Sequence, residues 1–217
     1  MIFDFLFPNR CIECSQIIDK QEIVCDICME KIGFANQFYG NNFLKERANL
    51  MFPVENAFAL MRYEKESLAQ KIIHQLKYYH QERTGKILAE WTTKRLIFEN
   101  KKPDLLVTVP LHRKKLKKRG YNQLHLFGNE LSEYYQIPIN HHLLKRMQHS
   151  KAQAKKNQTE RLKTKNTYRL TERISNKHIL LIDDVYTTGN TISNIVWEIL
   201  KNSENIKISL LVMAVDV

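Results

Sequence analysis

The pattern of apolar positions from residue 57 onward alternates between short continuous runs and stripes at helical spacing. Four runs read as strands, at residues 57–63, 105–109, 178–182 and 207–215. Apolar residues recur every three or four positions in segments that we expect to be helices, at residues 67–79, 86–98, 122–135 and 191–201. Strands that alternate with helices predict an α/β fold with a mostly parallel sheet flanked by helices.

Two stretches fall outside this alternation. Residues 29–55 are mixed and contain Gly33, Gly40 and Pro53, so we expect a connector with short helical pieces. Residues 140–177 are polar and strongly basic, and their weak periodicity gives no clear prediction of secondary structure.

The composition predicts a folded protein that attracts anions. A chain of 217 residues can hold one α/β domain and a small appendage, and its 43% hydrophobic and 26% charged residues are close to the globular average. The net charge of +11 favours encounters with nucleic acid or phosphorylated metabolites. Many basic proteins bind no DNA, however, so the charge alone leaves that question open.

The first eight residues are apolar but do not resemble a targeting signal. They include Asp4, lack a basic leader and are too short for the apolar core of a signal peptide. No run in the chain approaches the length of a membrane-spanning helix. We therefore expect a cytoplasmic protein whose apolar residues 3 and 5–7 pack the N-terminal segment onto the next domain.

All four cysteines lie in the first 28 residues, as the pairs Cys11/Cys14 and Cys25/Cys28. Two C-x-x-C pairs separated by ten residues can place four thiolates at the corners of a tetrahedron, as zinc prefers. Nothing indicates secretion, which disfavours disulfides, and a redox C-x-x-C would be a single pair in a thioredoxin-like unit. Four thiolates leave no position for a substrate, so we expect structural Zn²⁺ that stabilises a small finger. The predicted organisation is a zinc-binding finger at residues 1–35 and an α/β domain at residues 55–217.

The segment Ile179–Thr191, ILLIDDVYTTGNT, combines a strand, two acids and the start of a helix. In a parallel sheet, ligands bind beyond the carboxyl ends of the strands, where a helix N-terminus can hold a phosphate. Gly189 lets the backbone approach the anion, and the carboxylates of Asp183 and Asp184 can accept hydrogen bonds from ribose hydroxyls or hold Mg²⁺. The acids could also merely solubilise a strand end, but that alternative leaves the Thr-Thr-Gly-x-Thr sequence unexplained. The segment therefore predicts a ribose-phosphate site.

Ile179–Thr191 resembles the phosphoribosyl pyrophosphate (PRPP) motif of type I phosphoribosyltransferases, and the whole chain resembles the ComF family of competence proteins. The motifs that carry the family resemblance are Phe7-Pro8, the two cysteine pairs, His74–Tyr78, Val109–His112, Arg119–Gln123, Gln153, Arg161, Asn166 and the DDVYTTGNT stretch. The chain departs from the family pattern at Ser150, where Thr is usual, and at Thr167-Tyr168, where an aromatic residue usually follows the asparagine directly.

The resemblance implies a type I phosphoribosyltransferase-like domain and assigns roles to several residues. Asp183 and Asp184 would hold the ribose hydroxyls, with Mg²⁺ accompanying PRPP. The 5′-phosphate would be bound by the loop that follows: Thr187, Thr188, Gly189, Asn190 and Thr191. Residues Val109–His112, including Pro110, would meet the pyrophosphate.

Residues 113–119 place six cations in seven positions directly after a predicted strand end. We expect a basic loop there that contacts pyrophosphate or the backbone of single-stranded DNA. The residues assigned to these contacts are Pro110, His112, Arg113, Lys114, Lys115, Lys117, Lys118 and Arg119. A solvated, mobile loop is the alternative. A second basic set at residues 145–177 contains Tyr168 as its only aromatic residue, which gives little support for base stacking there. His141 and His142 are expected to be surface or core residues.

Two functions of different classes remain open. The first is a factor of natural transformation that binds single-stranded DNA and a PRPP-like ligand in the cytoplasm, with a helicase-like competence protein as the partner that the resemblance implies. The second is an active phosphoribosyltransferase that uses PRPP and Mg²⁺. No pocket for a particular base or amine acceptor can be read from the sequence.

Overall fold

A computed structural model of the chain describes residues 8–35, 39, 42–78, 82–98, 101–147 and 167–217. Its helices and strands follow one another as α2 Asp26–Met29, α3 Phe43–Asn49, β1 Ala57–Tyr63, α4 Leu68–Tyr78, α5 Glu82–Thr93, β2 Leu105–Thr108, α6 Arg113–Arg119, α7 Gln123–Tyr135, β3 Ile139–Asn140, β4 Leu144–Arg146, β5 Tyr168–Leu170, β6 Ser175–Tyr186, α9 Asn190–Asn202 and β7 Glu204–Asp216.

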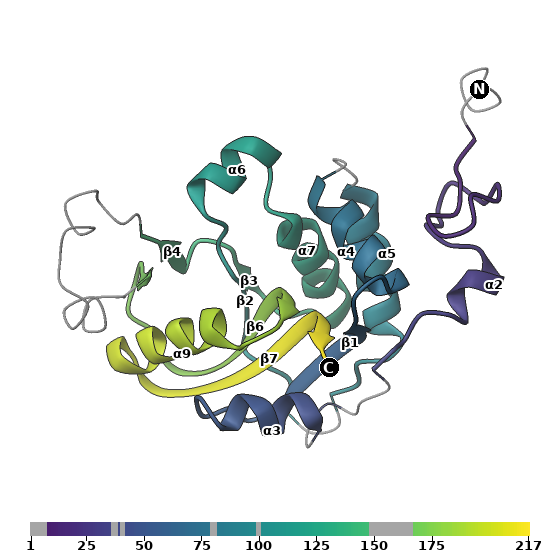
Figure 1. Ribbon diagram of the computed structural model, residues 1–217. Coiled ribbons are helices and arrows are strands. Elements are labelled where there is room, and N and C mark those ends of the chain that lie inside the picture. The colour runs from purple at the N-terminus through teal and green to yellow at the C-terminus, as the bar shows by residue number, and fades with distance from the viewer. Residues whose placement is uncertain (1–7, 36–38, 40–41, 79–81, 99–100, 148–166) are drawn as a thin grey trace, which may run out of the picture.

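Five of the strands form one sheet in the order β1-β7-β6-β2-β3, and every pairing within it is parallel. Helices α4, α5 and α7 lie on one side of this sheet, and α3 and α9 lie on the other (Figure 1). The central strands are apolar on both faces for this reason, and Ile179–Ile182 and Leu210–Val215 are almost completely buried. The predicted parallel α/β sheet is confirmed.

Several elements differ from the sequence-based expectation. The stripe at 86–98 predicted a helix that begins and ends later than α5, which spans Glu82–Thr93. It ends where the backbone N–H groups of Arg95 and Leu96 turn back to the Thr92 carbonyl. Residues 140–177 include two short strands, β4 and β5, which pair antiparallel. Their pattern was not visible because each spans only three residues.

The finger is joined to the larger domain by backbone and side-chain contacts. The Ala35 N–H donates to the Leu60 carbonyl at 2.9 Å, which continues the edge of β1. Arg83 of α5 donates to the Asn9 side chain at 2.9 Å and to the Glu22 carbonyl at 2.8 Å. Lys71 of α4 pairs with Glu13 at 2.8 Å. The predicted docking by residues 3 and 5–7 lies outside the residues that the structure describes.

Candidate functional site

The acidic pair lies at the carboxyl end of β6, in the middle of the sheet. Asp183 and Asp184 are still part of the strand, which runs on to Tyr186, so the strand is longer than the apolar run that predicted it. Each carboxylate accepts a hydrogen bond from the next backbone N–H: Asp183 from Asp184 at 2.8 Å, and Asp184 from Val185 at 2.7 Å. These bonds fix the orientation of both side chains at the carboxyl end of the strand.

Asp184 is held from two further sides. Its Oδ2 pairs with the Lys77 ammonium of α4 at 2.9 Å and accepts a hydrogen bond from the Gln123 amide of α7 at 2.7 Å. The carbonyl of Gln123 in turn accepts a hydrogen bond from Arg119 at 2.7 Å. Gln123 and Arg119 are both buried. The resulting chain, Arg119–Gln123–Asp184–Lys77, joins α6, α7, β6 and α4.

Asp183 is the more buried carboxyl group, with 9% of its surface exposed. Burial, and next the negative charge of Asp184, raise the pKa of Asp183 to about 8, although Lys77 and Arg146 act in the opposite direction. A carboxyl group with this pKa is largely protonated at neutral pH, so it can donate a hydrogen bond as well as accept one.

A pocket of about 220 Å³ opens beside the pair. We call it the carboxyl-end pocket, and it is lined by Lys77, Val109, Pro110, Leu111, Lys115, Arg119, Gln123, Leu124, Arg146, Tyr168, Asp183, Asp184, Val185 and Thr191. Four cations, the Asp184 carboxylate and the Asp183 carboxyl group meet in it, so it offers donors for a phosphate and acceptors for hydroxyls in one place.

The predicted phosphate loop forms the start of α9. Gly189 precedes the helix with a left-handed backbone (φ 75°) and has no side chain to cap it, so the first N–H groups of the helix can bind an anion. A side chain at Gly189 would meet the Tyr186 ring and Met51. Arg47 of α3 braces the loop by donating to the Thr187 carbonyl at 2.8 Å. Of the loop residues, Thr191 lines the carboxyl-end pocket; Thr187, Thr188, Gly189 and Asn190 lie beyond its lining.

The stretch Arg119–Gln123 connects the basic segment to α7, and its residues have separate structural roles. Gly120 ends α6 in a left-handed conformation (φ 79°). The Tyr121 hydroxyl donates to the Leu76 carbonyl at 3.0 Å. Asn122 accepts a hydrogen bond from the Leu124 N–H at 3.1 Å and donates to the Val109 carbonyl at 3.2 Å, which ties the start of α7 to the end of β2.

The basic segment is a helix and not the loop that the sequence predicted. In α6, the His112 ring accepts a hydrogen bond from the Lys114 N–H at 3.1 Å, and Gly120 closes the other end. Both caps satisfy helix termini that a sequence of cations would otherwise leave open. Five of its cations are exposed: Arg113, Lys114, Lys115, Lys117 and Lys118. In Figure 1 helix α6 stands away from the sheet, and Lys115 and Arg119 are the members of it that line the carboxyl-end pocket.

Four other side chains of the pocket were not assigned to it from the sequence. Lys77 and Gln123 belong to motifs of the family resemblance, but neither had a stated role. Arg146 was one of many cations in the second basic set. Tyr168, which was discounted for stacking, is buried in the pocket wall with the Arg146 guanidinium 5.4 Å from its ring. These residues come from α4, α7, β4 and β5, so only the folded structure shows that they lie together.

The two histidines expected at the surface or in the core lie away from the pocket lining. The His141 ring is bonded to Thr108 at 2.9 Å and to Asn129 at 2.8 Å, and it stacks on His125 with ring centroids 4.1 Å apart. Gln153, Arg161 and Asn166, as well as Ser150, lie outside the residues that the structure describes.

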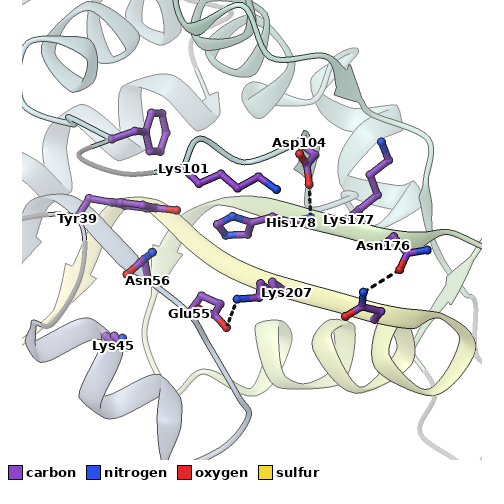
Figure 2. Close-up of a pocket in the computed structure, with 12 residues that line it drawn as sticks. Tyr39, Lys45, Glu55, Asn56, Lys101, Asp104, Asn176, Lys177, His178 and Lys207 are labelled. Atoms are coloured by element: carbon purple, nitrogen blue, oxygen red, sulfur yellow. Dashed lines mark hydrogen bonds and ion pairs between the residues drawn. The ribbon is translucent and has the colours of Figure 1, made fainter.

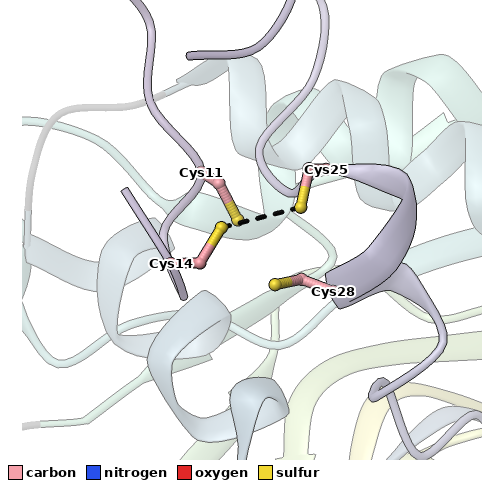
Figure 3. Close-up of side chains that lie close together, drawn as sticks. All are labelled: Cys11, Cys14, Cys25 and Cys28. Atoms are coloured by element: carbon pink, nitrogen blue, oxygen red, sulfur yellow. Dashed lines mark hydrogen bonds between the residues drawn. The ribbon is translucent and has the colours of Figure 1, made fainter. Parts of the chain in front are cut away.

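The four cysteines of the finger converge on one point (Figure 3). Their sulfur atoms all lie within 4.8 Å of one another, and Cys14 and Cys25 are 3.7 Å apart. Zinc bound tetrahedrally to sulfur at about 2.3 Å requires sulfur atoms about 3.8 Å apart, so the arrangement fits the metal. The thiolates of Cys11, Cys14, Cys25 and Cys28 would hold it, and the chain contains no other cysteine.

These features define a parallel α/β protein with an N-terminal four-cysteine zinc-binding cluster. Residues 2–39 match the double zinc ribbon domain. The chain is 32% identical to competence protein F of Haemophilus influenzae over 99 residues, which are 44% of this chain and 43% of that protein. It is 39% identical to competence protein ComFC of Bacillus subtilis over 89 residues, 41% and 35% of the two chains.

A third relative extends the match. The chain is 27% identical to DNA utilization protein YhgH of Escherichia coli K12 over 137 residues, 60% of each chain. Together with the zinc ribbon, these matches support membership of the ComF family, as the sequence motifs indicated. The chain spans between about a third and three fifths of the length of these relatives. In the part of the chain that the structure describes, no helix is both long and apolar enough to cross a membrane.

Proposed function

We propose that the protein acts in DNA uptake by binding single-stranded DNA, and that the carboxyl-end pocket binds a ribose-phosphate group such as that of PRPP. The observation that carries the proposal is the position of Asp183 and Asp184 beside the uncapped start of α9, with the exposed cations of α6 at the same end of the sheet. Relatives named for competence and DNA utilization support the DNA half of the proposal.

The ribose hydroxyls would be bound by the acidic pair. Asp184 presents a carboxylate whose position is fixed from three sides, and Asp183 provides a buried carboxyl group next to it. The same two groups would hold Mg²⁺, which neutralises the charge of a pyrophosphate when it is bound. Lys77 and Gln123 already bind the Asp184 carboxylate, so a ligand must compete with both side chains for it.

The phosphates would be bound by the surrounding positive groups. The first N–H groups of α9 lie at the loop that follows the acids, and Arg119, Arg146 and Lys115 line the pocket. Single-stranded DNA would reach the site across α6, whose exposed cations follow a phosphate backbone without reading its sequence.

The first test separates the ribose-phosphate site from the fold. Asp183→Asn combined with Asp184→Asn is expected to abolish PRPP binding, measured by calorimetry with Mg²⁺ present, while circular dichroism stays unchanged. Glu64→Gln combined with Glu66→Gln removes two exposed carboxylates elsewhere and is the matched control. Undiminished affinity in the Asp183/Asp184 variant would refute the site.

The second test separates DNA handling from phosphoribosyl transfer. Single-stranded DNA is titrated at rising salt, and in parallel the protein is incubated with PRPP, Mg²⁺ and a panel of bases while pyrophosphate release is measured. We expect steeply salt-dependent DNA binding. Turnover without DNA binding would overturn the proposal in favour of a working transferase.

A further inference from the structure

A second and larger cavity lies at the opposite end of the sheet. It has a volume of about 540 Å³, against about 220 Å³ for the carboxyl-end pocket. It is formed where β2, β6 and β7 begin and where residues 55 and 56 lead into β1, and we call it the amino-end pocket (Figure 2). His178 in its wall and Asp183 lie five residues apart on β6, about 17 Å along the strand, so the two pockets are separate.

Positive charge dominates the lining of the amino-end pocket. Four lysines contribute to it from four different segments: Lys45, Lys101, Lys177 and Lys207. Of the two carboxylates in the lining, Glu55 pairs with Lys207 at 3.4 Å and Asp104 accepts the backbone N–H of His178 at 2.7 Å. Lys45, Lys101 and Lys177 form no ion pair with another residue that the structure describes. The Asp104 carboxylate interacts electrostatically with Lys101 and Lys177, but the lining still carries more positive than negative charge for an anion to meet.

Tyr39 also belongs to the wall of this pocket. The Tyr39 oxygen is inaccessible to solvent beside Ser209 and Asn56, yet it makes no hydrogen bond of ordinary geometry within the described structure. Figure 2 shows it directed from the ring toward His178 and the centre of the cavity. Burial raises the pKa of Tyr39 to about 12, so the hydroxyl stays protonated and can donate. In this structure neighbouring groups cover the oxygen, so the contribution of Tyr39 to the pocket is its ring.

The arrangement of His178 argues for binding and against hydrolysis. Its ring is bonded to the Ser209 hydroxyl at 2.7 Å, and burial lowers its pKa, so it is neutral. Asp104 accepts from the backbone of His178 and does not orient the ring. Ser209 has no exposed surface, so no substrate can reach its oxygen. The histidine and serine instead form a rigid polar floor.

We propose that the amino-end pocket binds the phosphate of a nucleotide. The cavity is within the range of about 300–1,000 Å³ that small-molecule sites occupy, and a phosphate alone would fill a small part of it. The remaining space borders the rings of Tyr39 and Phe98 and the amides of Asn56 and Asn176. The two rings pack edge to face, with centroids 4.9 Å apart. An aromatic wall and amides suit the nucleoside part, and the lysines suit its phosphate. The inference does not depend on the function proposed for the carboxyl-end pocket.

The phosphate could belong to a free mononucleotide or to the 5′ end of single-stranded DNA. Both present the same monoester group to the lysines, so the test has an arm for each. Thymidine 5′-monophosphate is compared with thymidine and with inorganic phosphate. A 5′-phosphorylated oligothymidylate is compared with the same strand bearing a 5′-hydroxyl. Calorimetry on the full chain at low salt gives the affinities.

The variants separate this pocket from general electrostatic attraction. Lys101→Gln combined with Lys177→Gln is expected to weaken thymidine monophosphate binding at least tenfold. Lys31→Gln combined with Lys65→Gln makes the same change in net charge at exposed positions and is expected to leave the affinity unchanged.

The result that overturns the inference is also specific. The inference is overturned if the protein does not bind thymidine monophosphate, or if it binds thymidine equally well. It is also overturned if the Lys101/Lys177 and Lys31/Lys65 variants lose the same affinity for thymidine monophosphate. The Asp183→Asn/Asp184→Asn variant is expected to keep its affinity for thymidine monophosphate. Loss of binding in that variant would place the nucleotide in the carboxyl-end pocket and refute a second site.

Discussion

Gln123 connects the basic helix to the acidic pair, and it lies 61 residues from Asp184 in the sequence. Its amide donates to Asp184 and its carbonyl accepts from Arg119, so one buried side chain transmits the position of the basic helix to the acidic pair. The side-chain amide suits both partners, because its NH2 group faces a carboxylate and its oxygen faces a guanidinium. A carboxylate in its place would repel Asp184.

Gln123→Ala is expected to lower the affinity for PRPP about tenfold, since a hydrogen bond to a charged group contributes about 1.5 kcal/mol or more. The affinity is measured by calorimetry. Gln21→Ala, an exposed glutamine of the finger, is the control. Unchanged affinity in Gln123→Ala would show that Asp184 is held in place without it.

At this scale the sequence predicted the chemistry of the acids but not their surroundings. Asp183, Asp184 and Gly189 could be assigned because strand, acids and helix start are consecutive in the chain. Lys77 and Arg146 could not, because each is an ordinary cation in its own segment and acquires its position from α4 and β4. Proximity between distant segments leaves no local pattern in a single sequence.

Helix α6 shows how capping overrides an unfavourable composition. Six cations in seven residues repel one another at helical spacing, and a loop was predicted for this segment. The cations of the last turn, however, face the negative end of the helix, and His112 and Gly120 satisfy its termini. The consequence is a fixed row of charges with a defined direction.

Replacement of Lys114, Lys117 and Lys118 by Gln is expected to weaken single-stranded DNA binding and to flatten its salt dependence. The slope of log affinity against log salt should fall by about 0.7 for each phosphate that the variant no longer binds. Fluorescence anisotropy at several salt concentrations measures it. Lys20, Lys31 and Lys65 changed to Gln provide a control of equal charge; an equal decrease of the slope there would contradict a specific role for α6.

The contacts of α7 and β3 predict a pH-dependent stability. His141 lies between Thr108 and Asn129, and burial, with the nearby His125 and His142, lowers its pKa to about 4. The unfolded chain, with an ordinary histidine pKa near 6.5, therefore binds more protons between about pH 4 and 6.5. Stability should be fully present above that range and fall as the pH drops through it.

The expected loss is about 1 kcal/mol, because the ring is only partly buried and solvent weakens the effect. Urea denaturation at pH 4.5 and 7.5 measures it. His141→Gln should lose most of this difference between the two pH values, whereas the exposed His74→Gln should keep it. A pH dependence that is the same in all three proteins would contradict the assignment.

For the molecule as a whole, the alternation of apolar runs and stripes was sufficient to predict the parallel sheet. Central strands such as β6 and β7 are buried on both faces, so their sequence is continuously apolar and easy to recognise. The way the finger sits on the domain was not predictable. It depends on polar pairs such as Lys71 with Glu13 and Arg83 with Asn9, which are exposed or partly exposed residues with no distinguishing pattern. The division into residues 1–35 and 55–217 stays a prediction.

Cys25→Ser is expected to lose zinc and to loosen the finger, because three thiolates cannot close the tetrahedral site. Metal content is measured by elemental analysis and finger order by limited proteolysis. Ile27→Ser changes an exposed residue in the same short helix and is expected to keep its metal. Full zinc occupancy in Cys25→Ser would count against the four-cysteine site.

The attachment of the finger to α4 has a practical consequence for measurements with chelators. The finger pairs with Lys71, and the same helix carries Lys77, which holds Asp184 in the carboxyl-end pocket. Adding EDTA to test for a magnesium requirement would also extract zinc and loosen the finger that pairs with α4 through Lys71. A loss of PRPP binding in EDTA would therefore have two sources. Removing Mg²⁺ by dialysis, with the zinc content checked afterwards, keeps them apart.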